Sequence, residues 1–296
     1  MCCIEIQIES TCEALLWQRL KLQAWRIGAF VVFVDWSDQS RCGTSRHASK
    51  LGIKEIIMTA TTQTVREIAL EHPSSIRVFE QFGIDYCCGG RKPLAEACTA
   101  GNLEIGAVIA ALEATEKGPR PEVEDWASKS LERLSSHIVT THHAYIKREL
   151  PRLALLAEKV VNRHGSNHTE LPVIAAKLAQ LDEELTSHLA KEEAVLFPYM
   201  ASLERALANG RAKPRNCFGT IANPIAMMTQ EHDDAGRLIA EISNLSSHFT
   251  TPEDACPTYH AFFDGLREFE QDLHQHIHLE NNILFPRAIE LEQTAN

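Results

Sequence analysis

Apolar residues recur at helical spacing, three or four residues apart, in four long segments of the second half of the chain. Short polar stretches separate these segments, and proline or glycine stands near each break, as in "TTPED". The four segments cover about residues 126–163, 172–208, 224–249 and 257–292. Long amphipathic helices joined by brief connections predict an all-α fold, an antiparallel four-helix bundle.

Shorter helical patterns precede these segments. Apolar residues recur at helical spacing from Val65 onward, and Gly83 can end a short helix in the left-handed conformation. We expect a small helical module over residues 58–115. The stretch "EKGPRPEVED", residues 116–125, is rich in proline and charge and is typical of a linker. The bundle then occupies residues 126–296.

Residues 1–57 differ from the rest of the chain. They hold three of the four tryptophans and four of the nine cysteines, and no helical or strand period persists through their second half. We expect this stretch to be a non-native or disordered extension, with translation starting naturally at Met58. The alternative is a genuine, poorly ordered arm.

Composition excludes several classes of protein. The chain has 296 residues and a formal charge of −11, which argues against a nucleic-acid partner because such binders present a basic face. No apolar run approaches the roughly 20 residues of a membrane span, so no membrane partner is expected. The nine cysteines are odd in number and scattered, unlike a secreted disulfide framework, and favour a cytoplasmic location.

One phrase occurs twice in the bundle region, as "LTSHLAKEEAVLFP" and as "LHQHIHLENNILFP". Each copy places a histidine four residues before a glutamate: His188 with Glu192, and His276 with Glu280. Residues four apart share one helix face, and here that face is the apolar one that must turn inward. Burying an ionised glutamate and a histidine without a partner costs on the order of several kcal/mol of folding free energy.

Each copy is also preceded by a further histidine. His143 stands 45 residues before His188, and His232 stands 44 residues before His276. A single histidine on an apolar face is most often a hydrogen-bonded core residue, but duplicated spacing predicts a dinuclear metal site. Six nitrogen and oxygen ligands without thiolate favour iron or manganese over zinc. The predicted ligands are His143, His188, Glu192, His232, His276 and Glu280.

The remaining histidines near these positions are weaker candidates. His142, His274 and His278 are expected on other helix faces, whereas His164 and His168 fall in a predicted loop, either exposed or supporting the ligands.

Two adjacent cysteines, Cys87 and Cys88, precede a pair of glycines in the small module. Glycine allows a close backbone approach, and nearby cations such as Arg91 would lower a thiol pKa and raise its reactivity. We expect an exposed turn that can serve in redox chemistry or in the transfer of iron or nitric oxide. The alternative is that the two small side chains only pack a turn.

The chain resembles the iron–sulfur cluster repair di-iron proteins, the RIC family of the YtfE/ScdA type. The resemblance spans about residues 59–296 and rests on "FGIDYCCGG", "SHLAKEEAVLFP", "EHDDAG" and "HIHLENNILFP". It implies a hemerythrin-like bundle with two non-haem iron ions, bridged by Glu192, Glu280 and an oxo or hydroxo group. The family's ligands fall on the six residues named above, and its cysteine pair on Cys87 and Cys88.

The resemblance also implies a role in a bacterial cytoplasm, where damaged iron–sulfur proteins and nitric oxide or peroxide-derived ligands are the partners. A homodimer is compatible with the sequence. Two alternatives stay open: an enzyme that reduces nitric oxide, and a sensor or binder of nitric oxide, oxygen or iron. Gly236 replaces the second histidine that oxygen carriers place one turn after the first, which argues against oxygen carriage.

Overall fold

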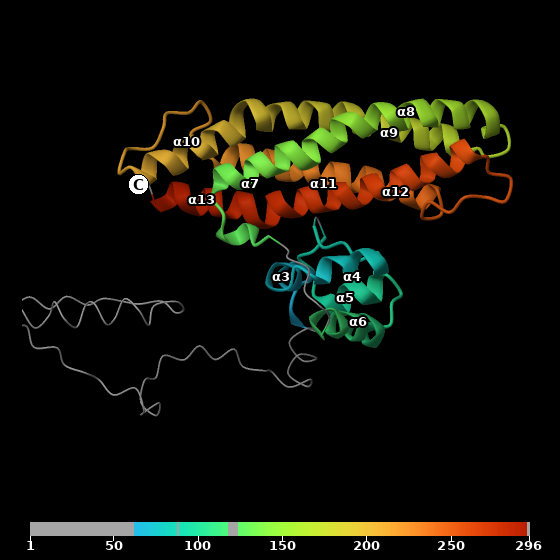
Figure 1. The fold of residues 1–296 in the computed structure, drawn as a ribbon, viewed down its shortest axis with the longest axis horizontal. Coiled ribbons are helices and arrows are strands. Elements are labelled where there is room, and N and C mark those ends of the chain that lie inside the picture. Colours follow the sequence, from blue (N-terminus) through green and yellow to red (C-terminus); the bar gives the residue numbers. More distant parts are fainter. Residues whose placement is uncertain (1–61, 88, 118–123, 295–296) are drawn as a thin grey trace, which may run out of the picture. The chain divides into compact units, whose positions relative to one another are not determined.

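The computed structural model describes residues 62–87, 89–117 and 124–294, and the regular structure in these ranges is helical (Figure 1). An isolated bridge between Thr64 and Pro93 is the only β pairing among the described residues. The all-α prediction is therefore confirmed for this part of the chain. The predicted extension, residues 1–57, lies outside the described residues, as does Cys88. None of the described helices is long and apolar enough to cross a lipid bilayer.

Four short helices form the small module: α3 (Val65–Glu71), α4 (Ser75–Phe82), α5 (Leu94–Ala100) and α6 (Ile105–Lys117). Helix α3 begins with a capping box, in which Thr64 and Glu67 each accept a hydrogen bond from the other's backbone amide. Helix α4 ends at Gly83, whose φ of 64° is in the left-handed region, as the sequence predicts. The module has its own apolar core, which includes Phe79, Tyr86 and Leu94.

The rest of the described chain forms four long helical rods that lie side by side (Figure 1). Three of the rods contain an internal π-helical segment; these segments are labelled η2, η3 and η4. A 3₁₀ turn, η1 (Trp126–Ser128), precedes the first rod. The first rod is α7 (Leu131–Ile138), η2 (Val139–His143) and α8 (Ala144–His164). The second is α9 (Glu170–Lys191), η3 (Glu192–Leu196) and α10 (Phe197–Ala208). The third is α11 (Ala222–Leu245), and the fourth is α12 (Pro257–His278), η4 (Leu279–Leu284) and α13 (Phe285–Thr294).

Two predicted helix boundaries differ from the structure. Helix α9 begins at Glu170, two residues before Pro172, because proline is tolerated in a first turn where the backbone N–H needs no partner. Helix α11 ends at Leu245 and not at Phe249. Ser247, His248 and Phe249 adopt positive φ angles of 49°, 56° and 57°, so the chain has already left the right-handed helix.

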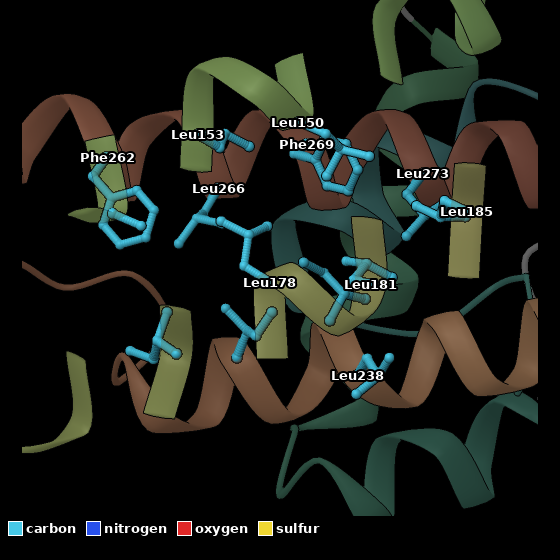
Figure 2. Packing of buried hydrophobic residues seen from close by; sticks show 14 of the residues in the cluster. Leu150, Leu153, Leu178, Leu181, Leu185, Leu238, Phe262, Leu266, Phe269 and Leu273 are labelled. Atoms are coloured by element: carbon cyan, nitrogen blue, oxygen red, sulfur yellow. The ribbon is translucent and has the colours of Figure 1, made fainter. Parts of the chain in front are cut away.

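The bundle core consists of two apolar layers. One layer includes Leu150 and Leu153 of α8, Leu181 of α9 and Phe269 of α12, which face one another between the rods (Figure 2). The other is built around Leu134, Met200, Ile225, Leu284 and Phe285. Along every rod the predicted histidine and glutamate ligands lie where the residues of one layer give way to those of the other. The fold therefore holds a polar layer between two apolar ones.

The packing of α8 provides a direct test of this core. Leu153 is completely buried, whereas Leu155, two residues further along the same helix, is 59% exposed. We expect Leu153→Ala to lower the free energy of unfolding by about 2–5 kcal/mol, because it leaves a cavity. Leu155→Ala should change that free energy by less than about 0.5 kcal/mol. Urea unfolding of both variants followed by circular dichroism provides the measurement, and equal losses would contradict the described packing.

Candidate metal centre

The polar layer brings together the six predicted ligands, and all four rods contribute. His143 ends η2, His188 lies in the last turn of α9, and Glu192 begins η3. His232 lies in the middle of α11. His276 lies near the end of α12, and Glu280 follows in η4. All six side chains are between 0 and 2% exposed. The six side chains are thus buried inside the bundle.

The six residues form two overlapping groups of potential metal ligands. One group is His188, His232, His276 and Glu280, and the other is His143, Glu192, His276 and Glu280. Within each group the potential ligand atoms lie within 4.8 Å of one another. Since His276 and Glu280 belong to both groups, the two positions adjoin, which is the arrangement that a pair of metal ions requires.

Both carboxylates lie between imidazoles. Glu192 Oε2 is 3.4 Å from His143 Nε2 and 3.3 Å from His188 Nε2. Glu280 lies 2.9 Å from His232 Nε2 through Oε2 and 3.0 Å from His276 Nε2 through Oε1. Each carboxylate therefore faces imidazoles from two rods.

Several buried atoms of this layer make no hydrogen bond within the described part of the protein. They are His143 Nε2, both carboxylate oxygens of Glu192, and His276 Nδ1. A buried carboxylate whose oxygens accept no hydrogen bond is costly, and a bound cation removes that cost. The donor set, four imidazoles and two carboxylates without thiolate, fits metal ions that prefer nitrogen and oxygen ligands.

Electrostatics in the layer are strongly coupled. Burial raises the pKa of Glu280, but the neighbouring His276 and hydrogen bonds from the surrounding imidazoles outweigh burial and hold that pKa well below its ordinary value. Burial lowers the pKa of His188, whereas Glu192 beside it raises the pKa, with a net result of about 10. The histidines and glutamates thus stabilise one another's charged forms, as opposite charges in a low-dielectric layer must.

Three further residues orient the imidazoles, and the sequence analysis missed them. His143 Nδ1 is 2.8 Å from Glu193 Oε1, and His188 Nδ1 is 2.9 Å from Glu231 Oε2. His232 Nδ1 is 2.9 Å from Asn281 Oδ1. An Nδ1–H that donates to such an acceptor leaves Nε2 with its lone pair towards the centre. We call these three residues anchors. The sequence offers one sign of them, because each anchor directly follows or precedes a predicted ligand in the chain.

The weaker histidine candidates have different surroundings. His142 is buried, its Nδ1 lies 2.9 Å from the acceptor Asp272 Oδ1, and its ring stacks on that of His276 with centroids 6.0 Å apart. His278 is bonded to Asn282 at 2.8 Å. His164 is the last residue of α8 and is buried, so its predicted place in the loop is wrong, and so is the alternative that it is exposed.

Cys87 also differs from its prediction. The side chain is 5% exposed, and its Sγ lies 3.3 Å from Asp85 Oδ1 as a hydrogen-bond donor. The Asp85 carboxylate further accepts from the backbone N–H groups of Cys87 and Gly89, which folds the segment into a tight turn. The predicted exposed presentation is therefore wrong for Cys87, because this turn directs the thiol inward. Cys88 lies outside the described residues.

A surface pocket of about 470 Å³ leads to the metal layer from the side of α9 and α11. His188 lies in its wall together with Glu184, Lys191, Glu231 and Asp234. Lys191 forms an ion pair with Glu231, the anchor of His188. A pocket with several carboxylates that reaches an imidazole of the centre can admit a small cation or ligand.

The anchor residues can be tested separately from the ligands. Glu231→Ala removes the acceptor of His188, and we expect affinity for the metal to fall about 10–100-fold, the usual effect of losing such an anchor. Glu241→Ala is the matched control, because Glu241 also lies on α11 and pairs with a lysine of α9, Lys177, but touches no imidazole. Competition with a chelator measures both affinities. Equal affinities in the two variants would show that the anchor has no effect on the metal.

Comparison with known proteins agrees with this architecture. The sequence profile of the Hemerythrin HHE cation binding domain matches residues 134–288, and that of ScdA_N, a domain of unknown function (DUF542), matches residues 61–116. The chain is 38% identical over 232 residues to the iron–sulfur cluster repair protein YtfE of Yersinia pseudotuberculosis and to that of Yersinia pestis. These alignments cover 78% of this chain and 99% of each relative. The chain therefore belongs to the family of iron–sulfur cluster repair proteins that includes YtfE.

Proposed function

We propose that this protein repairs iron–sulfur clusters damaged by nitrosative or oxidative stress, at a di-iron centre held by the six ligands of the polar layer. The observation that carries the proposal is the pair of buried carboxylates, each between imidazoles of two rods, together with both oxygens of Glu192, which accept no hydrogen bond among the described residues. The names of the Yersinia relatives supply the biological role. Damaged iron–sulfur proteins are the partners that this role requires.

Two iron ions bridged by Glu192, Glu280 and an oxo or hydroxo group form the proposed cofactor. When bound, such a pair supplies redox electrons and positions for small ligands such as nitric oxide. The chain's own residues keep the ligands in place: Glu193, Glu231 and Asn281 orient three imidazoles, and the two apolar layers exclude bulk water. In repair by donation, iron is the cargo, and the acidic pocket beside His188 provides it with a route.

We also propose a division of labour along the chain. Residues 58–115 form a cysteine-bearing domain, residues 116–125 a linker, and residues 126–296 the di-iron domain. Residues 1–57 are proposed to have no part in the activity. A reducing cytoplasm is the proposed location, supported by the nine cysteines of the sequence, which are odd in number and scattered, unlike a secreted disulfide framework.

The bridging role of the glutamates predicts the result of their removal. We expect Glu192→Ala and Glu280→Ala each to reduce iron content well below two ions per chain, because the imidazoles would surround a hole. Glu158→Ala, which removes an exposed carboxylate of α8 away from the pocket, should retain both ions. Metal analysis with Mössbauer spectroscopy provides the measurement. A coupled di-iron signal retained in full by both bridge variants would defeat the assignment.

The cysteine pair predicts a separation of metal binding from repair. The double variant Cys87→Ser with Cys88→Ser should keep its iron, because neither residue is a proposed ligand, and should lose much of its ability to reactivate a cluster enzyme damaged by nitric oxide. Thiolates are soft ligands and nucleophiles, able to accept iron or a nitrosyl group in transit.

Since Cys87 is buried, the folding and the iron content of the double variant are checked first. The single variants Cys87→Ser and Cys88→Ser then show which cysteine is responsible for a loss of reactivation. Reactivation by the double variant at the rate of the unmodified protein would exclude the cysteines from the chemistry. Sustained consumption of nitric oxide with a reductant, in place of reactivation, would favour the alternative of a nitric oxide reductase.

A further inference from the structure

A second group of potential metal ligands lies at the end of the bundle where α8 connects to α9 and α11 connects to α12 (Figure 1). It consists of His164, His168 and Asp254, whose potential ligand atoms lie within 4.8 Å of one another. His164 follows His143 by 21 residues in the same rod, which corresponds to about 30 Å of helix. This group is therefore separate from the di-iron layer.

The connection after α8 is shaped to bring its two histidines together. The carbonyl oxygen of His164 accepts hydrogen bonds from the backbone N–H groups of Asn167 and His168, both at 2.9 Å. Gly165 permits the turn, because a Cβ atom there would lie 2.5 Å from the carbonyl oxygen of Val161. The chain thus folds His168 back beside His164, while Asp254 approaches from the other connection.

His164 has an unsatisfied polar atom in this place. The residue is only 8% exposed, and its Nε2 makes no hydrogen bond within the described part of the protein. The ring packs against Tyr259, with centroids 5.4 Å apart, and the ring of His168 meets the same tyrosine edge-on at 5.7 Å. A buried imidazole nitrogen without a partner costs free energy that a ligand at this site can recover.

His168 has a carboxylate at each ring nitrogen. Its Nδ1 lies 3.3 Å from Glu170 Oε1, and its Nε2 lies 3.0 Å from Asp254 Oδ1. A neutral imidazole carries only one N–H, so one of these carboxylates must face a lone pair unless a cation lies between them. When Nδ1–H donates to Glu170, Nε2 is left to act as a ligand, which is the usual orientation of metal-binding histidines.

We propose that His164, His168 and Asp254 bind one divalent transition-metal ion of the Zn²⁺ type, in addition to the two irons of the central layer. Two imidazole nitrogens and one carboxylate favour such an ion over Mg²⁺ or Ca²⁺, which prefer oxygen ligands throughout. The Asp254 side chain is 54% exposed, so water can complete the coordination. The ion links the two connections at this end of the bundle.

The test uses the full chain with its iron bound and Zn²⁺ as the probe. Equilibrium dialysis followed by metal analysis should find one zinc ion per chain beyond the iron, with the iron content unchanged. His168→Ala and Asp254→Asn should each weaken zinc binding at least about tenfold, since each removes a ligand. Neither variant alters a buried residue, so both should fold.

His260→Ala is the matched control. His260 is also a histidine at this end of the bundle, but it is exposed and bonded to Thr251, outside the proposed group. This variant should bind the additional zinc as the unmodified protein does. Co²⁺ in place of Zn²⁺ provides an independent readout, because coordination by two imidazoles gives visible absorption bands that Asp254→Asn and His168→Ala should reduce.

Two results would overturn the proposal. One is the absence of any zinc beyond the iron positions, which would mean that His168 is an imidazolium held between Glu170 and Asp254. The other is additional zinc bound with equal affinity by His168→Ala, Asp254→Asn and His260→Ala, which would place the ion elsewhere. Neither result depends on repair activity, so the proposed function stands or falls by its own tests.

Discussion

The burial of two carboxylates and four imidazoles in one layer of a helical bundle is the constraint on which the rest of the structure depends. An isolated carboxylate in such a layer would cost several kcal/mol, of the order that breaks a marginally stable domain. Opposite charges compensate part of this cost, as the lowered pKa of Glu280 and the raised pKa of His188 indicate. The two oxygens of Glu192 still accept no hydrogen bond within the described part of the protein, and a cation would satisfy them.

The residues that hold this layer in place form hydrogen bonds and ion pairs that lead from the buried imidazoles to the surface of the bundle. Glu193 and Glu231 hold two imidazoles, and each of these carboxylates is in turn paired with a lysine, Lys147 or Lys191. His232 is held by the neutral amide of Asn281 instead. A carboxylate makes an imidazole a stronger base than an amide does, so the imidazoles of the layer are not electronically equivalent. The chain thereby builds an asymmetric centre from a duplicated sequence pattern.

The sequence predicted those features that follow from the helical period alone. His188 with Glu192 and His276 with Glu280 share a face by spacing, and the distances of 3.3 and 3.0 Å confirm that they meet. The anchors could not be predicted in the same way, because Glu231 touches His188 only when α9 and α11 are neighbours. The inward turn of Cys87 depends on three hydrogen bonds to Asp85, a local arrangement without a periodic signature. Boundaries such as the end of α11 depend on backbone angles that the composition of the segment does not reveal.

The π-helical segments beside the ligands have a consequence for anyone who would design such a protein. A π turn holds one residue more than an α turn, and one residue corresponds to about 100° of rotation. In three of the four rods, therefore, the apolar stripe beyond the ligands is out of phase with the stripe before them, unlike a regular heptad repeat. A binary pattern with one uninterrupted period would align a single stripe and rotate half of the core into water. A synthetic version would need a one-residue insertion at each of these three turns. An alignment of the two halves would need a gap only where η2 of the first rod is compared with α11, which has no π segment.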